Sequence, residues 1–183
     1  MNETLQTLIT RRSCRKYLSM PVEQKKVERV IEAGLYAPSG KGFQSPIIIA
    51  VTNDEVRQRL SKVNKEILEE MLGKAIPNLP DPFYGAPVFL AVIAPADRPH
   101  KQLDGSLTLG NMMNAAHAEG LGTCWIHRAL QTFAMPEWKA WLTEVGLDPE
   151  VEYEGVGFLS LGYPDGEPAA PPARKEGRVF WVK

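Results

Sequence analysis

Residues 11–17 read RRSCRKY and place four cations and a serine hydroxyl within seven positions. Guanidinium groups match phosphate oxygens bidentately, and Ser13 and nearby backbone N–H groups can donate further hydrogen bonds to the same anion. Asn2 can cap a short amphipathic helix that ends near Thr10, so the cluster lies where a helix gives way to a loop. We interpret the cluster as an anion site; the alternative for such a run, seen alone, is a solvated basic patch.

The composition limits the kinds of partner that this cluster can serve. The chain has 183 residues, 44% of them hydrophobic and 23% charged, which predicts a single globular domain over residues 1–183. The net charge of -1 provides no overall basic field for nucleic acid or anionic lipid. We therefore expect a small anionic ligand and no nucleic-acid partner.

The sequence contains no segment that would place the protein in or across a membrane. No apolar run approaches the roughly 20 residues that span a bilayer. The first residues, MNETLQTLITRR, lack the charged-then-apolar order of a signal peptide. We therefore expect a cytoplasmic protein without a membrane partner.

The cysteines and histidines do not have the spacing of a metal site. Cys14 and Cys124 form no CxxC motif, and His100, His117 and His127 form no HExxH motif. We predict reduced thiols and no metal, with one isolated disulfide as the alternative.

Hydrophobic periodicity and capping residues predict the regular elements. Ser19 and Pro21 indicate a helix start, Asn53 or Asp54 a second, and Asp104 a third. The expected helices cover residues 21–36, 54–73, 104–119 and a segment from Pro136, and the expected strands cover residues 47–52, 88–94, 123–127 and 155–163. Strand and helix do not alternate strictly, which indicates an α+β fold with helices packed around one sheet.

Two further stretches are expected to be irregular. Residues 76–87 hold four prolines with Phe83 and Tyr84; these aromatic rings either pin the loop to the core, which we favour, or cover a pocket. Residues 164–183 read as an extended arm that ends in the apolar residues 179–182. Because exposed apolar area is unfavourable at about 25 cal/mol per Å², this tip is expected to pack on a partner subunit.

The chain resembles the FMN-dependent nitroreductase family along most of its length. The resemblance rests on five stretches in order, namely RRSCRKY at 11–17, APSGKGFQSP at 37–46, EGLGTCWI at 119–126, GFLSLGYP at 157–164 and PPARK at 171–175. It implies a central, mostly antiparallel sheet surrounded by helices, with an extended C-terminal arm. It also implies a homodimer with FMN at the subunit interface and NAD(P)H as the electron donor.

The resemblance assigns cofactor-binding roles to residues at both ends of the chain. Arg11, Arg12 and Ser13 match positions that hold the FMN phosphate and ribityl chain, and Arg15 matches a cation near the flavin pyrimidine. A positive charge there would stabilise the anionic reduced flavin. Arg174, with Lys175 beside it, matches a tail cation that reaches the same phosphate.

A turn-rich loop supplies further positions. Pro38, Ser39 and Gly40 match a loop that approaches the flavin from the other subunit, and Gln44 is retained from the same motif. The chain departs from the family pattern PSSxNxQPW, since it has Gly40 for the second serine, Gly42 for the asparagine and Ser45 after Gln44. Without the resemblance, the same residues read as a helix stop followed by a turn.

The third expected strand supplies the last positions. Trp125, Ile126 and His127 match a strand end that lies along one face of the flavin, where backbone N–H groups near His127 and Arg128 can donate to N5. A fixed donor there would orient the ring for hydride transfer. The alternative is that Trp125 and Ile126 are core residues and His127 is a structural neighbour.

These assignments imply an oxidoreductase that uses NAD(P)H to reduce nitroaromatics, quinones or similar small acceptors by ping-pong hydride transfer. No residue is required as a nucleophile or general acid, so we name no catalytic side chain. One alternative is a non-catalytic flavin or nucleotide-phosphate binding protein, and another is a relative with different flavin chemistry, such as dehalogenation or flavin fragmentation. A third is an interaction module that uses the apolar tail.

Overall fold

The structure, a computed structural model, describes residues 1–78 and 80–183; Leu79, within the proline-rich stretch expected to be irregular, lies outside the described residues. The elements are α1 (Glu3–Thr10), α2 (Gln24–Leu35), a 3-10 turn η1 (Gly40–Gly42), β1 (Ile47–Val51), α3 (Asp54–Leu72), β2 (Val88–Pro95), α4 (Lys101–Ala118), β3 (Gly122–Ile126), α5 (Ala129–Ala134), α6 (Pro136–Glu144) and β4 (Tyr153–Gly162).

The four strands form one sheet in the order β1-β2-β4-β3, and each neighbouring pair is antiparallel. The register places Ile49 opposite Ala91, and Leu159 lies between Leu90 on one side and Trp125 on the other. The α+β fold with a mostly antiparallel sheet is therefore confirmed.

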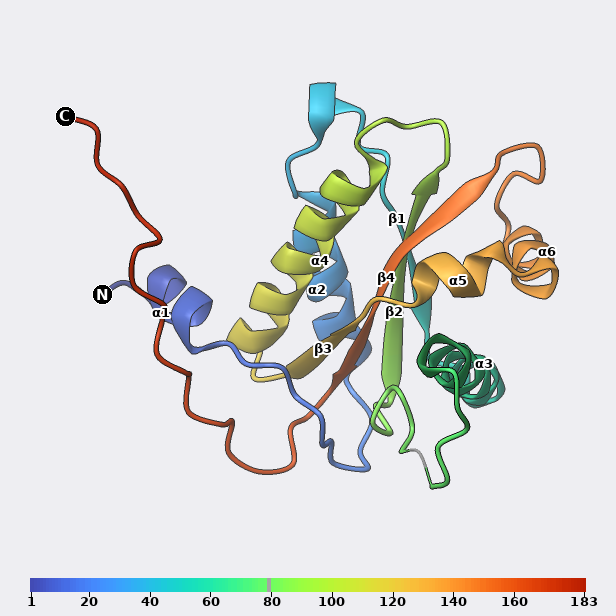
Figure 1. Ribbon diagram of the computed structural model, residues 1–183, viewed down its shortest axis with the longest axis horizontal. Coiled ribbons are helices and arrows are strands. Elements are labelled where there is room, and N and C mark those ends of the chain that lie inside the picture. The colour runs from blue at the N-terminus through green and yellow to red at the C-terminus, as the bar shows by residue number, and fades with distance from the viewer. Residues whose placement is uncertain (79) are drawn as a thin grey trace.

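Helices cover both faces of this sheet (Figure 1). Helices α2 and α4 pack on the face that carries Leu90 and Leu159, while α3, α5 and α6 pack on the face that carries Phe89 and Phe158. Alternate residues of β2 enter the two cores, and every residue from Val88 to Ala94 is buried. This two-sided burial explains why the strand is a continuous apolar run.

Local capping explains several helix boundaries. The Asn2 side chain accepts a 2.9 Å hydrogen bond from the Leu5 N–H, and the Asn53 side chain accepts one of 3.0 Å from Val56. Gly73 ends α3 in the left-handed region at φ +64°, where glycine carries no Cβ penalty. The predicted starts of α1 and α3 and the predicted end of α3 are therefore confirmed.

Two predicted helix starts are wrong, because Ser19 does not cap α2 and the Asp104 side chain accepts a hydrogen bond from Gly40 instead. Helix α2 begins at Gln24 rather than residue 21, and Glu23 at its N-cap accepts a 2.6 Å hydrogen bond from the Tyr163 hydroxyl. Helix α4 begins at Lys101, so Asp104 lies in its first turn rather than at its cap. The sequence reasoning also missed α5, a six-residue helix with no side-chain cap.

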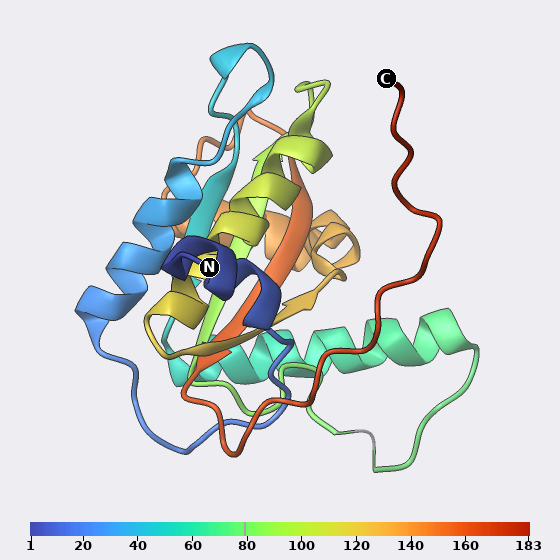
Figure 2. The ribbon, with the colours of Figure 1, turned by 90° about the vertical axis from the view of Figure 1, so that its left-hand side faces the viewer.

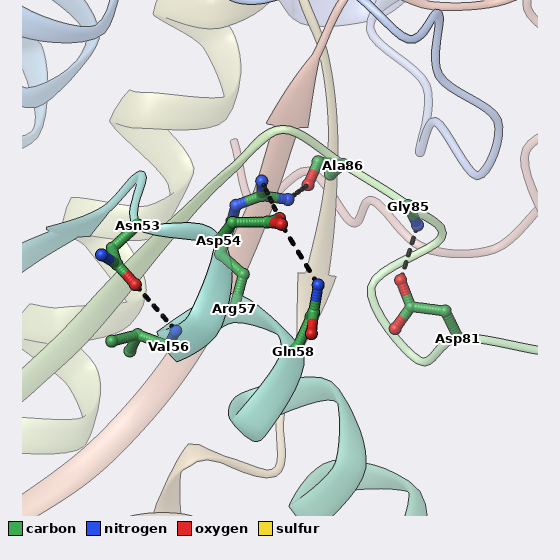
Figure 3. A network of polar contacts seen from close by, with 8 residues as sticks. All are labelled: Asn53, Asp54, Val56, Arg57, Gln58, Asp81, Gly85 and Ala86. Atoms are coloured by element: carbon green, nitrogen blue, oxygen red, sulfur yellow. Dashed lines mark hydrogen bonds and ion pairs between the residues drawn. The ribbon is translucent and has the colours of Figure 1, made fainter.

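The loop before β2 is held to the core and to α3. Phe83 is fully buried and stacks on Phe89 with ring centroids 3.9 Å apart. The Asp81 carboxylate accepts a hydrogen bond from the Gly85 N–H, and Arg57 donates to the Ala86 carbonyl at 3.0 Å (Figure 3). The same carboxylate also accepts a hydrogen bond from the Phe83 N–H. The prediction that an aromatic residue pins this loop is confirmed for Phe83.

The C-terminal segment leaves the sheet after β4, and Figure 2 shows its terminal part standing clear of the helices. No helix or strand is assigned within residues 165–183, and the segment 166–183 is exposed. Its apolar tip is among the most exposed parts of the described chain, with Phe180 at 85% and Val182 at 100%. None of the described helices has the length and apolar character needed to cross a membrane.

Candidate functional site

Residues 13–18 are fixed in place by backbone hydrogen bonds to two strands. The Cys14 N–H donates to the Thr123 carbonyl at 2.8 Å, and the Leu18 N–H donates to the Tyr163 carbonyl at 2.9 Å. The returning chain adds a third contact, from the Asp165 N–H to the Lys16 carbonyl at 2.9 Å. The basic cluster is therefore held between the start of β3 and the end of β4.

Glycine in β3 and a buried tyrosine allow this close approach. A Cβ on Gly122 would lie 2.6 Å from the Cys14 Cβ, so only glycine fits there. The Tyr17 hydroxyl lies 2.9 Å from the Ser160 Oγ and 3.0 Å from the Cys14 carbonyl. Burial raises the pKa of Tyr17 far above its ordinary value, so the phenol stays neutral and acts as a structural pin.

The cluster opens into a cavity of about 290 Å³. Its walls come from the loop after α1, the last turn of α4, the start of β3 and the segment after β4. The lining residues are Arg11, Arg12, Ser13, Cys14, Arg15, Lys16, His117, Gly120, Leu121, Gly122, Thr123, Pro164, Asp165, Gly166, Glu167, Pro168 and Ala169. Four of the predicted binding residues, Arg11, Arg12, Ser13 and Arg15, thus share one cavity.

The arginines of this cavity carry charge that no neighbouring acid neutralises. Lys16 pairs with Asp165 at 2.7 Å, but no described carboxylate lies within ion-pair distance of Arg11, Arg12 or Arg15. The Nη1 of Arg11 and the Nε of Arg12 are buried without a hydrogen-bond partner among the described residues. Buried donors without acceptors are costly, and a phosphate group supplies several strong acceptor oxygens. The residues present therefore fit a phosphate-bearing ligand.

Arg15 provides a cation on the other side of the cluster. The neighbouring Cys124, followed by Tyr84, raises the pKa of Arg15 above its ordinary value. Burial in turn raises the pKa of the Cys124 thiol, which keeps the sulfur neutral near pH 7. Both cysteines are free. The Arg15 charge is left available for an anionic group.

The predicted loop of residues 38–44 lies at the opposite end of α4 (Figure 1). Helix α4 has 18 residues and therefore spans about 27 Å. Pro38, Ser39 and Gln44 line a separate cavity of about 160 Å³, and the Gly40 N–H donates to Asp104 at 2.9 Å. One chain alone therefore does not bring this loop to the arginine cavity.

The β3 positions divide between core and surface. Ile126 is buried, Trp125 is 36% exposed with its indole Nε1 against Gly157, and His127 is exposed. The alternative prediction that both residues belong to the core is therefore confirmed for Ile126 and wrong for Trp125. All three lie outside the lining of the arginine cavity.

The tail cations do not meet the cluster within the described chain. Arg174 and Lys175 are exposed, Arg174 donates to the carbonyl of Pro172 at 2.7 Å, and neither lines the cavity. Residues 164–169 of the same segment do line it. The shared role of Arg11 and Arg174 therefore stays a prediction.

Sequence reasoning missed one residue of the arginine cavity, and it considered only the backbone N–H of Arg128, not its side chain. His117 lines the arginine cavity, although its helical position carried no motif. Arg128 is only 7% exposed, its Nε donates to the Asn64 Oδ1 at 3.2 Å, and burial lowers its pKa.

Comparison with known proteins supports the resemblance. A crystal structure of a Bacteroides fragilis nitroreductase with bound FMN superposes with a TM-score of 0.89 at 26% identity and covers 100% of both chains. The putative NAD(P)H nitroreductase YdjA of Escherichia coli K12 is 26% identical over 170 residues, which is 88% of each protein. An NADPH-flavin oxidoreductase of Vibrio harveyi is 36% identical over 62 residues, but this match spans only 34% of our chain and 26% of that protein.

The family model described as "Nitroreductase family" matches residues 8–163. That range includes the basic cluster, the 37–46 loop and all four strands. The chain belongs to the nitroreductase family.

Proposed function

We propose that this protein is an FMN-dependent oxidoreductase that uses NAD(P)H to reduce nitroaromatics, quinones or similar small acceptors. The observation that carries the proposal is the cavity in which, among the described residues, Arg11, Arg12 and Arg15 have no acidic partner and two buried guanidinium nitrogens have no acceptor. Family membership and the FMN bound by the Bacteroides fragilis relative support the same ligand.

Each group of the cavity has a defined task in this proposal. Arg11, Arg12 and Ser13 bind the phosphate, because guanidinium forks and a hydroxyl match its oxygens. Arg15 stabilises the negative charge that accumulates on reduction. Bound FMN would supply the hydride chemistry, with NAD(P)H as the electron donor and the small acceptor as the second substrate in ping-pong order.

The proposal includes a homodimer with the flavin site at the interface. The apolar face of α1 is unpartnered in one chain, where Leu5, Leu8 and Ile9 are 49%, 50% and 53% exposed. Leu103 and Leu107 of α4 are exposed to 66% and 47%. A second copy would cover these faces and the tail, and it would bring Pro38, Ser39, Gly40 and Gln44 toward the cavity of its partner.

The remaining binding positions are proposed on the family pattern. Trp125, Ile126 and His127 would lie along the flavin ring, and Arg174 and Lys175 would reach its phosphate. We propose one FMN-binding domain over residues 1–183, with residues 164–183 on the partner. Two free cysteines are consistent with the reducing cytoplasm that we propose as its location.

The test is an absorption spectrum of the purified protein, with and without added FMN, followed by NADH and NADPH oxidation with menadione or a nitroaromatic acceptor. Bound flavin with steady turnover is the expected result. Bound flavin without turnover would instead identify a non-catalytic flavin-binding protein. A colourless protein that does not take up FMN would refute the proposal and favour an interaction module.

A further inference from the structure

His117 joins α4 to the end of α1 beside the arginine cavity. Its Nε2 lies 2.8 Å from the Thr10 Oγ1, and Thr10 directly precedes Arg11. The imidazole is partly buried and lines the same cavity as Arg11, Arg12 and Ser13. The family motifs do not include this residue, and the proposed function does not yet use it.

The hydrogen bonds determine which nitrogen of His117 carries the proton. The Thr10 hydroxyl donates its single proton to the Gln6 carbonyl at 2.8 Å, because a carbonyl oxygen can only accept. Nε2 of His117 must therefore donate to the Thr10 Oγ1. Nδ1 is left as an acceptor, with no hydrogen-bond partner recorded among the described residues, and it gains the proton if the ring becomes charged.

The surroundings of the ring keep it neutral in the free protein. Burial, followed by the charges of Arg11 and Arg12, lowers the pKa of His117 below its ordinary value. The other charged groups nearby belong to several elements: Glu3 of α1 lines a neighbouring cavity with His117, and Arg15, Lys16, Asp165 and Glu167 line the arginine cavity. Of these, Asp165 is paired with Lys16. Glu119, the residue directly after α4, is paired with Arg29.

We propose that His117 is the titrating member of the anion site formed by Arg11 and Arg12, and that its Nδ1 takes up a proton from water when a phosphate dianion enters the cavity. The physical reason is that the ligand changes the charge around the His117 ring. Two guanidinium charges disfavour a third cation, whereas a dianion between them neutralises both and favours it. The inference rests on the proposed function only for the identity of FMN as the phosphate carrier.

Binding and protonation must then be linked in both directions. Between the His117 pKa of the free protein and the higher His117 pKa of the complex, the binding of one phosphate takes up one proton. The affinity for phosphate therefore falls as the pH rises through this interval. The affinity gain is about tenfold for each unit by which the ligand raises the His117 pKa. A phosphate monoester itself titrates near pH 6, so each measurement needs a variant without the imidazole at the same pH.

The direct test is an NMR titration of the three histidine rings in flavin-free protein, first alone, then with inorganic phosphate, then with FMN. His117→Gln identifies the His117 resonance, since glutamine keeps a donor for Thr10 but cannot titrate. We expect the His117 pKa to rise with either ligand. If neither ligand raises the pKa of any histidine ring, the inference is overturned, whether or not the variant folds.

A second measurement compares FMN affinity in wild type and His117→Gln between pH 5.5 and 8. The ratio of the wild-type FMN affinity to the His117→Gln affinity should be largest at low pH and should approach one at high pH. For riboflavin, which lacks the phosphate, the same ratio should not change with pH. Lys25→Gln, an exposed residue of α2 that does not line the cavity, is the control and should keep the wild-type pH dependence. A flat FMN ratio would overturn the inference but leave the proposed cofactor intact. Failure to bind FMN at all would refute the proposed function, and the phosphate titration would still decide the role of His117.

Discussion

The backbone N–H of Gly40 donates a 2.9 Å hydrogen bond to the Oδ1 of Asp104, which ties the 38–44 loop to the first turn of α4. Asp104 is only 5% exposed and has no cationic partner among the described residues. A Cβ on Gly40 would lie 2.6 Å from the Cδ2 of His100, so the loop packs closely against the start of the helix. One carboxylate therefore fixes the loop that we expect to reach the partner's flavin.

Replacing Asp104 by alanine should destabilise the protein and loosen this loop. The Gly40 N–H would lose its acceptor, which costs about 1–3 kcal/mol for a buried group. Asp104→Asn keeps an acceptor oxygen, so its free energy of unfolding should lie closer to that of the wild type. Urea unfolding measures the free-energy difference, and identical midpoints for Asp104→Ala and wild type would contradict the assigned role.

Replacing Arg11 by alanine should weaken FMN binding. A hydrogen bond to a charged group contributes about 1.5–3 kcal/mol, which corresponds to roughly a 10- to 150-fold increase in Kd. Flavin fluorescence measures this change directly. Lys25→Ala removes an exposed cation of α2 that does not line the cavity and should leave the affinity unchanged. Unchanged affinity in Arg11→Ala would remove Arg11 from the site.

Replacing Arg174 by alanine tests whether the tail reaches the same phosphate in the assembled protein. We expect the FMN affinity to fall in the same direction as for Arg11→Ala, because both cations would face one dianion. The effect should shrink as salt is raised. If FMN affinity falls in Arg11→Ala but not in Arg174→Ala, the arginine cavity keeps its assigned role. The tail would then contribute to dimer assembly and not to phosphate binding.

Deleting residues 179–183 should loosen the dimer. The deletion removes Phe180 and Trp181, which are 85% and 82% exposed in one chain and need a surface to cover them. Sedimentation velocity over a concentration series should show a shift toward monomer. Val145→Ser alters an exposed apolar residue of the chain segment after α6 and should keep the wild-type profile. A truncated protein with that same profile would rule out exchange of the tail.

The flavin-free protein should lose stability as the solution is acidified below about pH 6.5, the ordinary histidine pKa. The folded-state pKa of His117 is lowered, so the unfolded chain binds the proton first. This contribution to stability is present above the unfolded pKa and is lost as pH falls toward the folded pKa. Urea midpoints between pH 8 and 5 should fall less in His117→Gln than in wild type. If the urea midpoints of wild type and His117→Gln fall in parallel with pH, His117 would have the same pKa in the folded and unfolded protein, which would contradict the prediction.

Local chemistry explains the parts of the structure that could be read from the chain. Asn2 and Asn53 cap helices because their acceptors reach N–H groups three residues away, and Gly73 ends α3 because it tolerates a left-handed backbone. The apolar run of residues 88–94 indicated a buried strand by the same local reasoning. The cation cluster of residues 11–17 needed only its own composition to be recognised as a candidate anion site.

Contacts across long sequence separations decided the rest. Asp104 has the composition of a helix cap, yet its carboxylate accepts a hydrogen bond from the Gly40 N–H, 64 residues away. Glu23 is not a favoured capping residue, yet it stands at the N-cap of α2, where the Tyr163 hydroxyl donates to it from 140 residues away. The position of His117 beside Arg11 likewise depends on the packing of α1 against α4, which brings Thr10 to a residue 107 positions later in the chain. Side-chain type and spacing determined which groups could bind an anion, but only the folded chain determined which of them share a cavity, because that depends on through-space packing rather than on local periodicity.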